Sequence, residues 1–183
     1  MQMLRYRVDG FDRLSIARKK LIYYLSEAAL AGRDILWDQN GKYNLRIRKT
    51  LETLYTDYPG DRDSKDFRAL AVYLKRVWFA NGIHHHYGCE KFKPEFSEAF
   101  FREAVRNVPA DKRPLEEGQT AEELCELLAP VSFDPEVTPK RGNQANGDDL
   151  GRTSACNYYG DGVTQTEAET FYNAMKQEGD PHP

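Results

Sequence analysis

The residues best suited to chemistry lie in one short run, HHHYGCEK, at positions 84–91. Imidazole is a common metal ligand, and in an extended segment His84 and His86 would share a face. Three adjacent histidines cannot converge on one ion, however, and the sequence contains only one further histidine, His182. Histidines that form hydrogen bonds within a loop therefore explain this run better than a native metal site does.

Cys89 follows these histidines closely, and a thiol beside an imidazole is one way to build a nucleophile. Nothing in the sequence indicates an oxyanion hole or a group that would orient such a pair. Cys125 and Cys156 are widely spaced and form no Cys-x-x-Cys pair, so reduced thiols are expected rather than a disulfide framework. The loop is still a candidate for binding, because polar loops with aromatic residues often carry recognition.

Length and composition limit the class of protein. The 183 residues suffice for one domain or a large domain fragment, and 40% hydrophobic with 30% charged residues is typical of a soluble globular protein. A net charge of -3 gives no general attraction to nucleic acid or to anionic lipid. The longest apolar stretches are too short to span a bilayer, and no secretory signal is visible. A cytoplasmic location is therefore expected.

Most of the chain shows apolar residues at helical spacing, punctuated by capping and stop signals. Ser15, Asn44, Ser64 and Ser97 are the predicted N-caps of four helices, and Thr120 with Glu123 has the capping-box spacing of a fifth that Pro130 should close. Thr164 with Glu167 repeats that spacing before a last helix, which Gly179 should stop. The predicted helices are 15–40 with an interruption at Gly32, 44–55, 64–80, 97–107, 120–128 and 165–178.

The stretch 130–153 differs, because it is rich in Pro, Gly, Asn and Asp and shows no period. We expect a long surface loop there. Leu4–Val8 and Ala155–Tyr159 are predicted to be short strands, and two such strands make only a marginal sheet. The expected fold class is therefore α+β and predominantly helical, with a sheet that something outside the chain completes. The turn-like ending GDPHP fits the same expectation of a piece of a larger protein.

Two segments carry a family resemblance. NGIHHHYGCEKFKP, at 81–94, resembles a signature near the start of dipeptidyl peptidase III enzymes, roughly Asn-x-Gly-x-Tyr-x-Ser-Phe-Gly-Asp-x-Lys-Phe-x-Pro. ACNYYGDGVTQTEAETFYNAMK, at 155–176, is similar to a strand, loop and capped helix of the same family. The resemblance covers nearly the whole chain in order, and the stretch YYLSEAALAGRDILWDQNGKYNLRIRKTLE favours a bacterial branch. In the first segment Gly82, Gly88, Lys91, Phe92 and Pro94 match the signature, Asn81 falls one place away, and His84, Tyr87 and Cys89 replace its Tyr, Phe and Asp.

The resemblance implies a two-lobed zinc exopeptidase that removes dipeptides from the N-terminus of oligopeptides. In that family the upper lobe holds zinc through His-Glu-x-x-Gly-His or a variant, and the substrate adds as a strand to a β-core of the lower lobe. Residues 1–183 would be the N-terminal part of the lower, non-catalytic lobe. None of the four histidines is followed by Glu, so we expect the zinc ligands and the general base outside this chain, with no catalytic residue and no metal ligand in it.

The resemblance also implies a binding role for the loop. Tyr87 takes the place of an aromatic residue that in the family helps to line the pocket for the substrate's N-terminal residues. Tyr87, Gly88 and His86 are therefore the expected substrate-binding residues. The expected partners are an oligopeptide and the missing catalytic lobe, without nucleic acid or membrane. The alternative that the sequence leaves open is an independent helical binding or scaffold module with no catalytic role.

Overall fold

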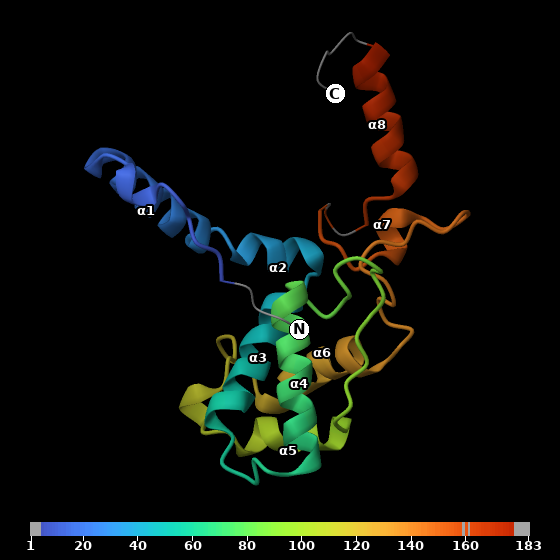
Figure 1. The fold of residues 1–183 in the computed structure, drawn as a ribbon. Helices are drawn as coiled ribbons and strands as arrows, with labels where there is room; N and C mark the ends of the chain where they lie inside the picture. The colour runs from blue at the N-terminus through green and yellow to red at the C-terminus, as the bar shows by residue number, and fades with distance from the viewer. Residues whose placement is uncertain (1–4, 159, 161, 178–183) are drawn as a thin grey trace. The chain divides into compact units, whose positions relative to one another are not determined.

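The computed structural model describes residues 5–158, 160 and 162–177. The chain divides into two units, Met1–Ile35 and Leu36–Pro183, and each is described by itself. The described residues are predominantly helical, as predicted (Figure 1).

The first unit consists mainly of one helix. A short 3-10 turn, Phe11–Arg13, precedes α1, Ile16–Ala31. Ser15 is its N-cap, because its hydroxyl oxygen accepts the backbone N–H of Arg18 at 3.4 Å. The chain breaks at Gly32 as expected, and α2, Asp34–Asn40, follows. No residue of α1 is buried.

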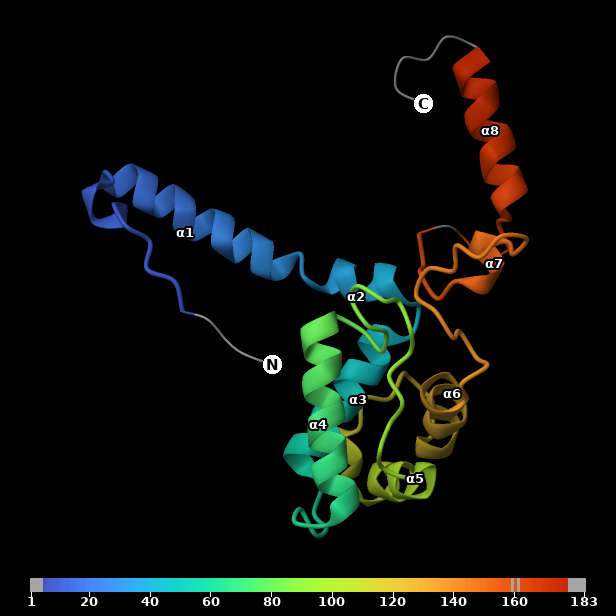
Figure 2. The ribbon, with the colours of Figure 1, turned by 45° about the vertical axis from the view of Figure 1, so that its right-hand side comes forward.

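Four helices build the core of the second unit: α3, Asn44–Asp57; α4, Lys65–Ala80; α5, Glu98–Asn107; and α6, Ala121–Phe133. Helix α3 packs on α4, and α5 packs on α6 (Figures 1 and 2). Each contributes apolar residues at helical spacing to one interior, as its sequence pattern predicts. The large aliphatic side chains that are fully buried are those of Leu51, Leu54, Leu70, Leu74, Val77, Ile83, Val105, Val108, Leu124 and Leu128.

Most predicted caps are confirmed. Ser64 and Ser97 each accept the backbone N–H three residues ahead, and Thr120 forms a complete capping box with Glu123. The prediction for Asn44 was wrong, because Tyr43 is the N-cap of α3 and makes no side-chain cap. The Asn44 side chain instead accepts the buried N–H of Ile83 at 3.3 Å. This long-range bond is invisible to a local capping rule.

The close approach of Asn44 explains one glycine. Gly82 has φ +153°, a conformation that L side chains rarely adopt. A Cβ on Gly82 would lie 2.5 Å from Nδ2 of Asn44. The turn after α4 therefore needs glycine where it passes the start of α3.

The predicted stop at Pro130 was also wrong. Helix α6 continues through Pro130 to Phe133, where the backbone N–H of Asp134 bonds to the Pro130 carbonyl. Val131 and Phe133 pack against the core, and this packing offsets the hydrogen bond that a helical proline loses. The expected loop 130–153 is correspondingly shorter, and it contains a further short helix, α7, Leu150–Thr153.

The predicted strands are absent from residues 5–8 and 155–158, the parts of them that the structure describes. Backbone hydrogen bonds instead join four short, largely extended segments, 83–85, 89–92, 139–141 and 155–157, which we call the extended cluster. Phe92 N–H bonds to Ile83 O at 2.8 Å, and Arg141 N–H bonds to Cys89 O at 2.8 Å. Cys156 N–H then bonds to Arg141 O at 3.0 Å. The pairs are too short for regular strands, and two isolated bridges are assigned between them.

The last helix, α8, Gln165–Gln177, begins with the predicted capping box of Thr164 and Glu167. It buries none of its described residues and extends away from α3–α6 in both views (Figure 2). Its predicted stop, Gly179, lies outside the described residues. None of the helices in the described ranges combines the length and apolar content needed to cross a membrane.

Candidate functional site

The histidine-rich run forms a tight hairpin that belongs to the extended cluster. Helix α4 ends at Asn81 in a left-handed conformation, φ 53°, which turns the chain into the hairpin. His85 N–H bonds to Glu90 O at 2.8 Å. At the tip, Nδ1 of His85 accepts the backbone N–H of Tyr87 at 3.3 Å and of Gly88 at 3.0 Å. The tip is therefore fixed by its own backbone and one imidazole.

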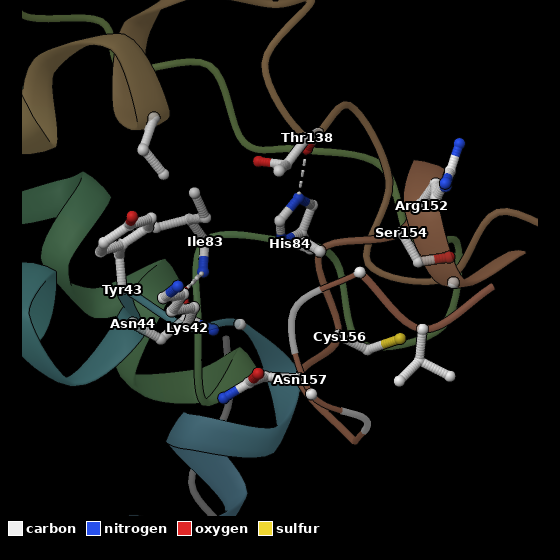
Figure 3. Close-up of a pocket in the computed structure, with 17 residues that line it drawn as sticks. Lys42, Tyr43, Asn44, Ile83, His84, Thr138, Arg152, Ser154, Cys156 and Asn157 are labelled. Carbon is white, nitrogen blue, oxygen red and sulfur yellow. Dashed lines mark hydrogen bonds between the residues drawn. The ribbon is translucent and has the colours of Figure 1, made fainter.

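His84 is a buried histidine with a defined tautomer. It is 2% exposed, and its Nε2 lies 2.8 Å from the carbonyl oxygen of Thr138 (Figure 3). A carbonyl only accepts, so Nε2 carries the proton and Nδ1 is left without a partner. Burial lowers the pKa of His84, and the charges of Lys91 and Arg141 lower it further. The imidazole is thus neutral near pH 7.

A cavity of about 350 Å³ adjoins His84, between the turn before α3 and residues of 151–157, 160, 162 and 163 (Figure 3). Three atoms from residues that line it are buried without a hydrogen-bond partner: Nδ2 of Asn44, Nδ1 of His84 and Oγ1 of Thr138. A polar space of this size suits ordered water. The cavity is therefore a polar space between two segments, and water suits it better than an apolar ligand does.

Lys91 binds the end of α6 to the hairpin. Its ammonium group donates to the carbonyl oxygens of Val131 at 3.0 Å and Asp134 at 2.6 Å, and also to that of Val137. Burial lowers the pKa of Lys91. Lys91, which matches the family signature, therefore has a structural role in this chain.

Tyr87 and Gly88 line a second, more open hollow of about 750 Å³. Tyr87 is 85% exposed, and the exposed Tyr158 lines the same hollow. The third expected site residue, His86, is not among the lining residues. The His86 ring lies against the Tyr87 ring, with centroids 4.4 Å apart, and against the Phe79 ring, with centroids 4.9 Å apart. The remaining lining residues are Asn40, Cys89, Lys140, Arg141, Gly142, Gln144 and Cys156.

The described residues do not fit a zinc ion. His84 bonds to a carbonyl, His85 accepts two backbone N–H groups, and His86 packs between aromatic rings. Within residues 5–158, 160 and 162–177, no group of three or more His, Cys, Asp or Glu side chains is placed to hold a metal. His182 lies outside these residues.

The described geometry gives no support to a Cys89 nucleophile. Its Sγ lies 3.7 Å from the Tyr87 carbonyl oxygen and 3.8 Å from Nη2 of Arg141. Neither of these partners is an imidazole that could take its proton. The three cysteines are free thiols.

Sequence reasoning did not identify three of the residues that line the hollow beside Tyr87. Lys140, Arg141 and Gln144 lie in the stretch that was expected to be a loop, and backbone pairing with the hairpin brings them to Tyr87. One signal was available, since two adjacent cations precede Gly142 in an otherwise aperiodic segment. It could not reveal which segment they would join.

The comparisons with known proteins leave the family open. No protein-family model matches the chain, and no curated protein matches it. The likeness to dipeptidyl peptidase III therefore depends on the motifs quoted from the sequence.

Proposed function

We propose that this chain is the N-terminal, peptide-binding part of a zinc-dependent dipeptidyl peptidase of the dipeptidyl peptidase III type. In this proposal it forms part of the lower lobe, contributes to the cleft for oligopeptides and is inactive alone. Zinc and the general base belong to the catalytic lobe of the same protein, outside this chain.

One observation supports the proposal above the others. The two segments that carry the resemblance, 81–94 and 155–176, are separated by 60 residues in the sequence and bond to the same short segment in the fold. Residues 139–141 join them, because Arg141 bonds through its backbone to Cys89 on one side and Cys156 on the other. Tyr87 and Tyr158 come from these two segments and line one hollow. Extended backbone beside exposed tyrosines is suited to an extended peptide.

Peptide binding by the full chain tests the proposal. The probe is an octapeptide of Ala, Val and Gln with a free N-terminus and an amidated C-terminus, titrated into ¹⁵N-labelled protein and followed by NMR. Its only charge is the N-terminal ammonium, and we call it the carboxylate-free octapeptide. We expect saturable shifts at residues 85–89 and 140–142. Tyr87→Ala should weaken binding by about 1–3 kcal/mol, about 5- to 150-fold in Kd, since an aromatic contact is lost.

Tyr6→Ala is the matched control, because Tyr6 is 82% exposed against 85% for Tyr87. It should leave the Kd unchanged. The chain alone should release no dipeptide from a dipeptidyl arylamide. Turnover that a chelator abolishes and zinc restores would show that the catalytic centre lies in this chain, against the proposal.

A second candidate is an independent helical binding or scaffold module. It is favoured by the finding that α1 and α8 bury none of their described residues, which leaves two helices available to a partner. Under this alternative the octapeptide would bind wild type and Tyr87→Ala equally, or bind neither.

A further inference from the structure

The hollow beside Tyr87 has an uneven charge. Lys140 and Arg141 line it, and no Asp or Glu is among the described residues that line it. Neither cation forms an ion pair with any carboxylate in the described part of the chain. Other arginines of the same unit are paired, as Arg46 is with Glu116 and Arg106 with Glu122. The hollow therefore has two cations that form no ion pair among the described residues, and the exposed Glu90 carboxylate lies beside Gly88.

The position of Arg141 is fixed by its surroundings. Its backbone bonds to Cys89 and Cys156 at 2.8 and 3.0 Å, and Nη2 donates to His86 O at 3.1 Å. The guanidinium is thus anchored through one nitrogen while other N–H groups have no partner among the described residues. Its charge also reaches the buried imidazole of His84, where it contributes to the lowered pKa. An anchored guanidinium loses little freedom when it binds an anion.

We propose that the hollow selects peptides that carry a carboxylate, with Arg141 and Lys140 as the groups that recognise it. This inference rests on the proposed peptide-binding function. Arg141 supplies N–H donors at a fixed position, and the exposed Lys140 adds a mobile charge beside it. Asn40 and Gln144 bring neutral amides to the same wall, and Tyr87 and Tyr158 bring ring faces for the neighbouring residues of the peptide. The carboxylate comes either from an acidic side chain or from the peptide's own C-terminus.

Three octapeptides with free N-termini separate these sources in NMR titrations of the full chain. The first is the carboxylate-free amidated octapeptide, the second carries one Gln→Glu exchange and remains amidated, and the third is the sequence of the first with a free C-terminal carboxylate. We expect the second, the third or both to bind about 10-fold more tightly than the first at low salt. The preference should shrink in 0.5 M NaCl, because screening weakens exposed charge pairs.

Two variants assign the effect to residues. Lys140→Gln removes an exposed charge with little risk to the fold, and Arg141→Gln removes the anchored one. Each should reduce the carboxylate preference several-fold, measured as the ratio of the Kd of the carboxylate-free octapeptide to that of the carboxylate-bearing one. Lys93→Gln, at another exposed lysine near the hairpin, should retain the full preference.

The outcomes distinguish this inference from the function on which it rests. If the carboxylate-free octapeptide binds at Tyr87 and neither carboxylate improves binding, the selectivity is refuted and the peptide site stands. An acidic preference that persists in both Lys140→Gln and Arg141→Gln also refutes it, since other cations would then be responsible. If none of the three peptides binds, both proposals fail.

Discussion

Helices α1 and α4 look alike in sequence and differ completely in environment. Both have 16 residues, both follow a serine N-cap, and both are rich in apolar side chains. Helix α4 buries Phe67, Leu70, Tyr73, Leu74, Val77 and Ala80, whereas α1 buries nothing. A cap and good helix formers are thus enough to start a helix, but they do not decide whether it is packed.

The difference lies in how the charges are distributed. In α4 the charged residues Arg68, Lys75 and Arg76 alternate with the apolar stripe, so that one face is left for the core. In α1 three of the four charged residues gather in Arg18-Lys19-Lys20 near its start, and among the residues that follow only Ser26 and Glu27 interrupt the apolar side chains. A helix that is apolar all round is typical of a buried position. Among the described elements, α1 therefore exposes the most large apolar side chains.

Matched leucine truncations should give the largest contrast. Leu70 in α4 is 0% exposed, and Leu70→Ala should lower the free energy of unfolding by about 2–5 kcal/mol through lost transfer energy and a cavity. Leu25 in α1 is 60% exposed, and Leu25→Ala should change it by no more than about 0.5 kcal/mol. Urea unfolding monitored by circular dichroism measures both. Equal losses would show that Leu25 is buried in solution.

The packed unit should also respond to pH through His84, with a smaller effect. The pKa of His84 is lowered in the folded protein from the usual 6.5. Just below pH 6.5, the unfolded chain therefore binds a proton at His84 and the folded chain does not. The contribution of neutral His84 to the free energy of unfolding is full above pH 6.5, and it declines as the pH falls toward the pKa of His84 in the folded protein. Urea unfolding between pH 7.5 and 5 measures this decline.

NMR titration of the imidazole protons provides the direct check on His84. Its midpoint should lie below 6.5, and His84→Gln should flatten the pH dependence of unfolding in this range. His85→Gln, at the half-exposed neighbour, should leave that dependence in place. A His84 midpoint at or above 6.5 would contradict its burial as a neutral group.

The two capping boxes give the smallest and most local contrast. Thr120 begins α6, which packs in the core, and Thr164 begins α8, which buries no described residue. Thr120→Ala should lower the global free energy of unfolding by about 1 kcal/mol. Thr164→Ala should leave global unfolding unchanged and speed amide hydrogen exchange in α8 alone. Global destabilisation by Thr164→Ala would show that α8 is coupled to the core.

Much of the helical framework follows from the sequence because its signals are local. Ser64, Ser97 and the Thr120–Glu123 pair each satisfy backbone donors within three residues, so spacing alone identifies them. The break at Gly32 is local in the same way. Where a local rule failed, distant packing had overridden it, as when α6 continued through Pro130 to bring Val131 and Phe133 to the core.

Only the tertiary structure decided how the candidate site is assembled. The sequence singled out Tyr87 and Gly88, and it could not show that Arg141 and Tyr158 would share their hollow. His84 meets Thr138 across 54 residues, and Lys91 reaches the carbonyls of Val131 and Asp134 at the end of α6 across 40 or more. Such contacts have no sequence period, because they depend on loop backbone groups that any residue carries. The sequence by itself determined where helices start and which loop is rich in chemistry, while packing determined what that loop faces.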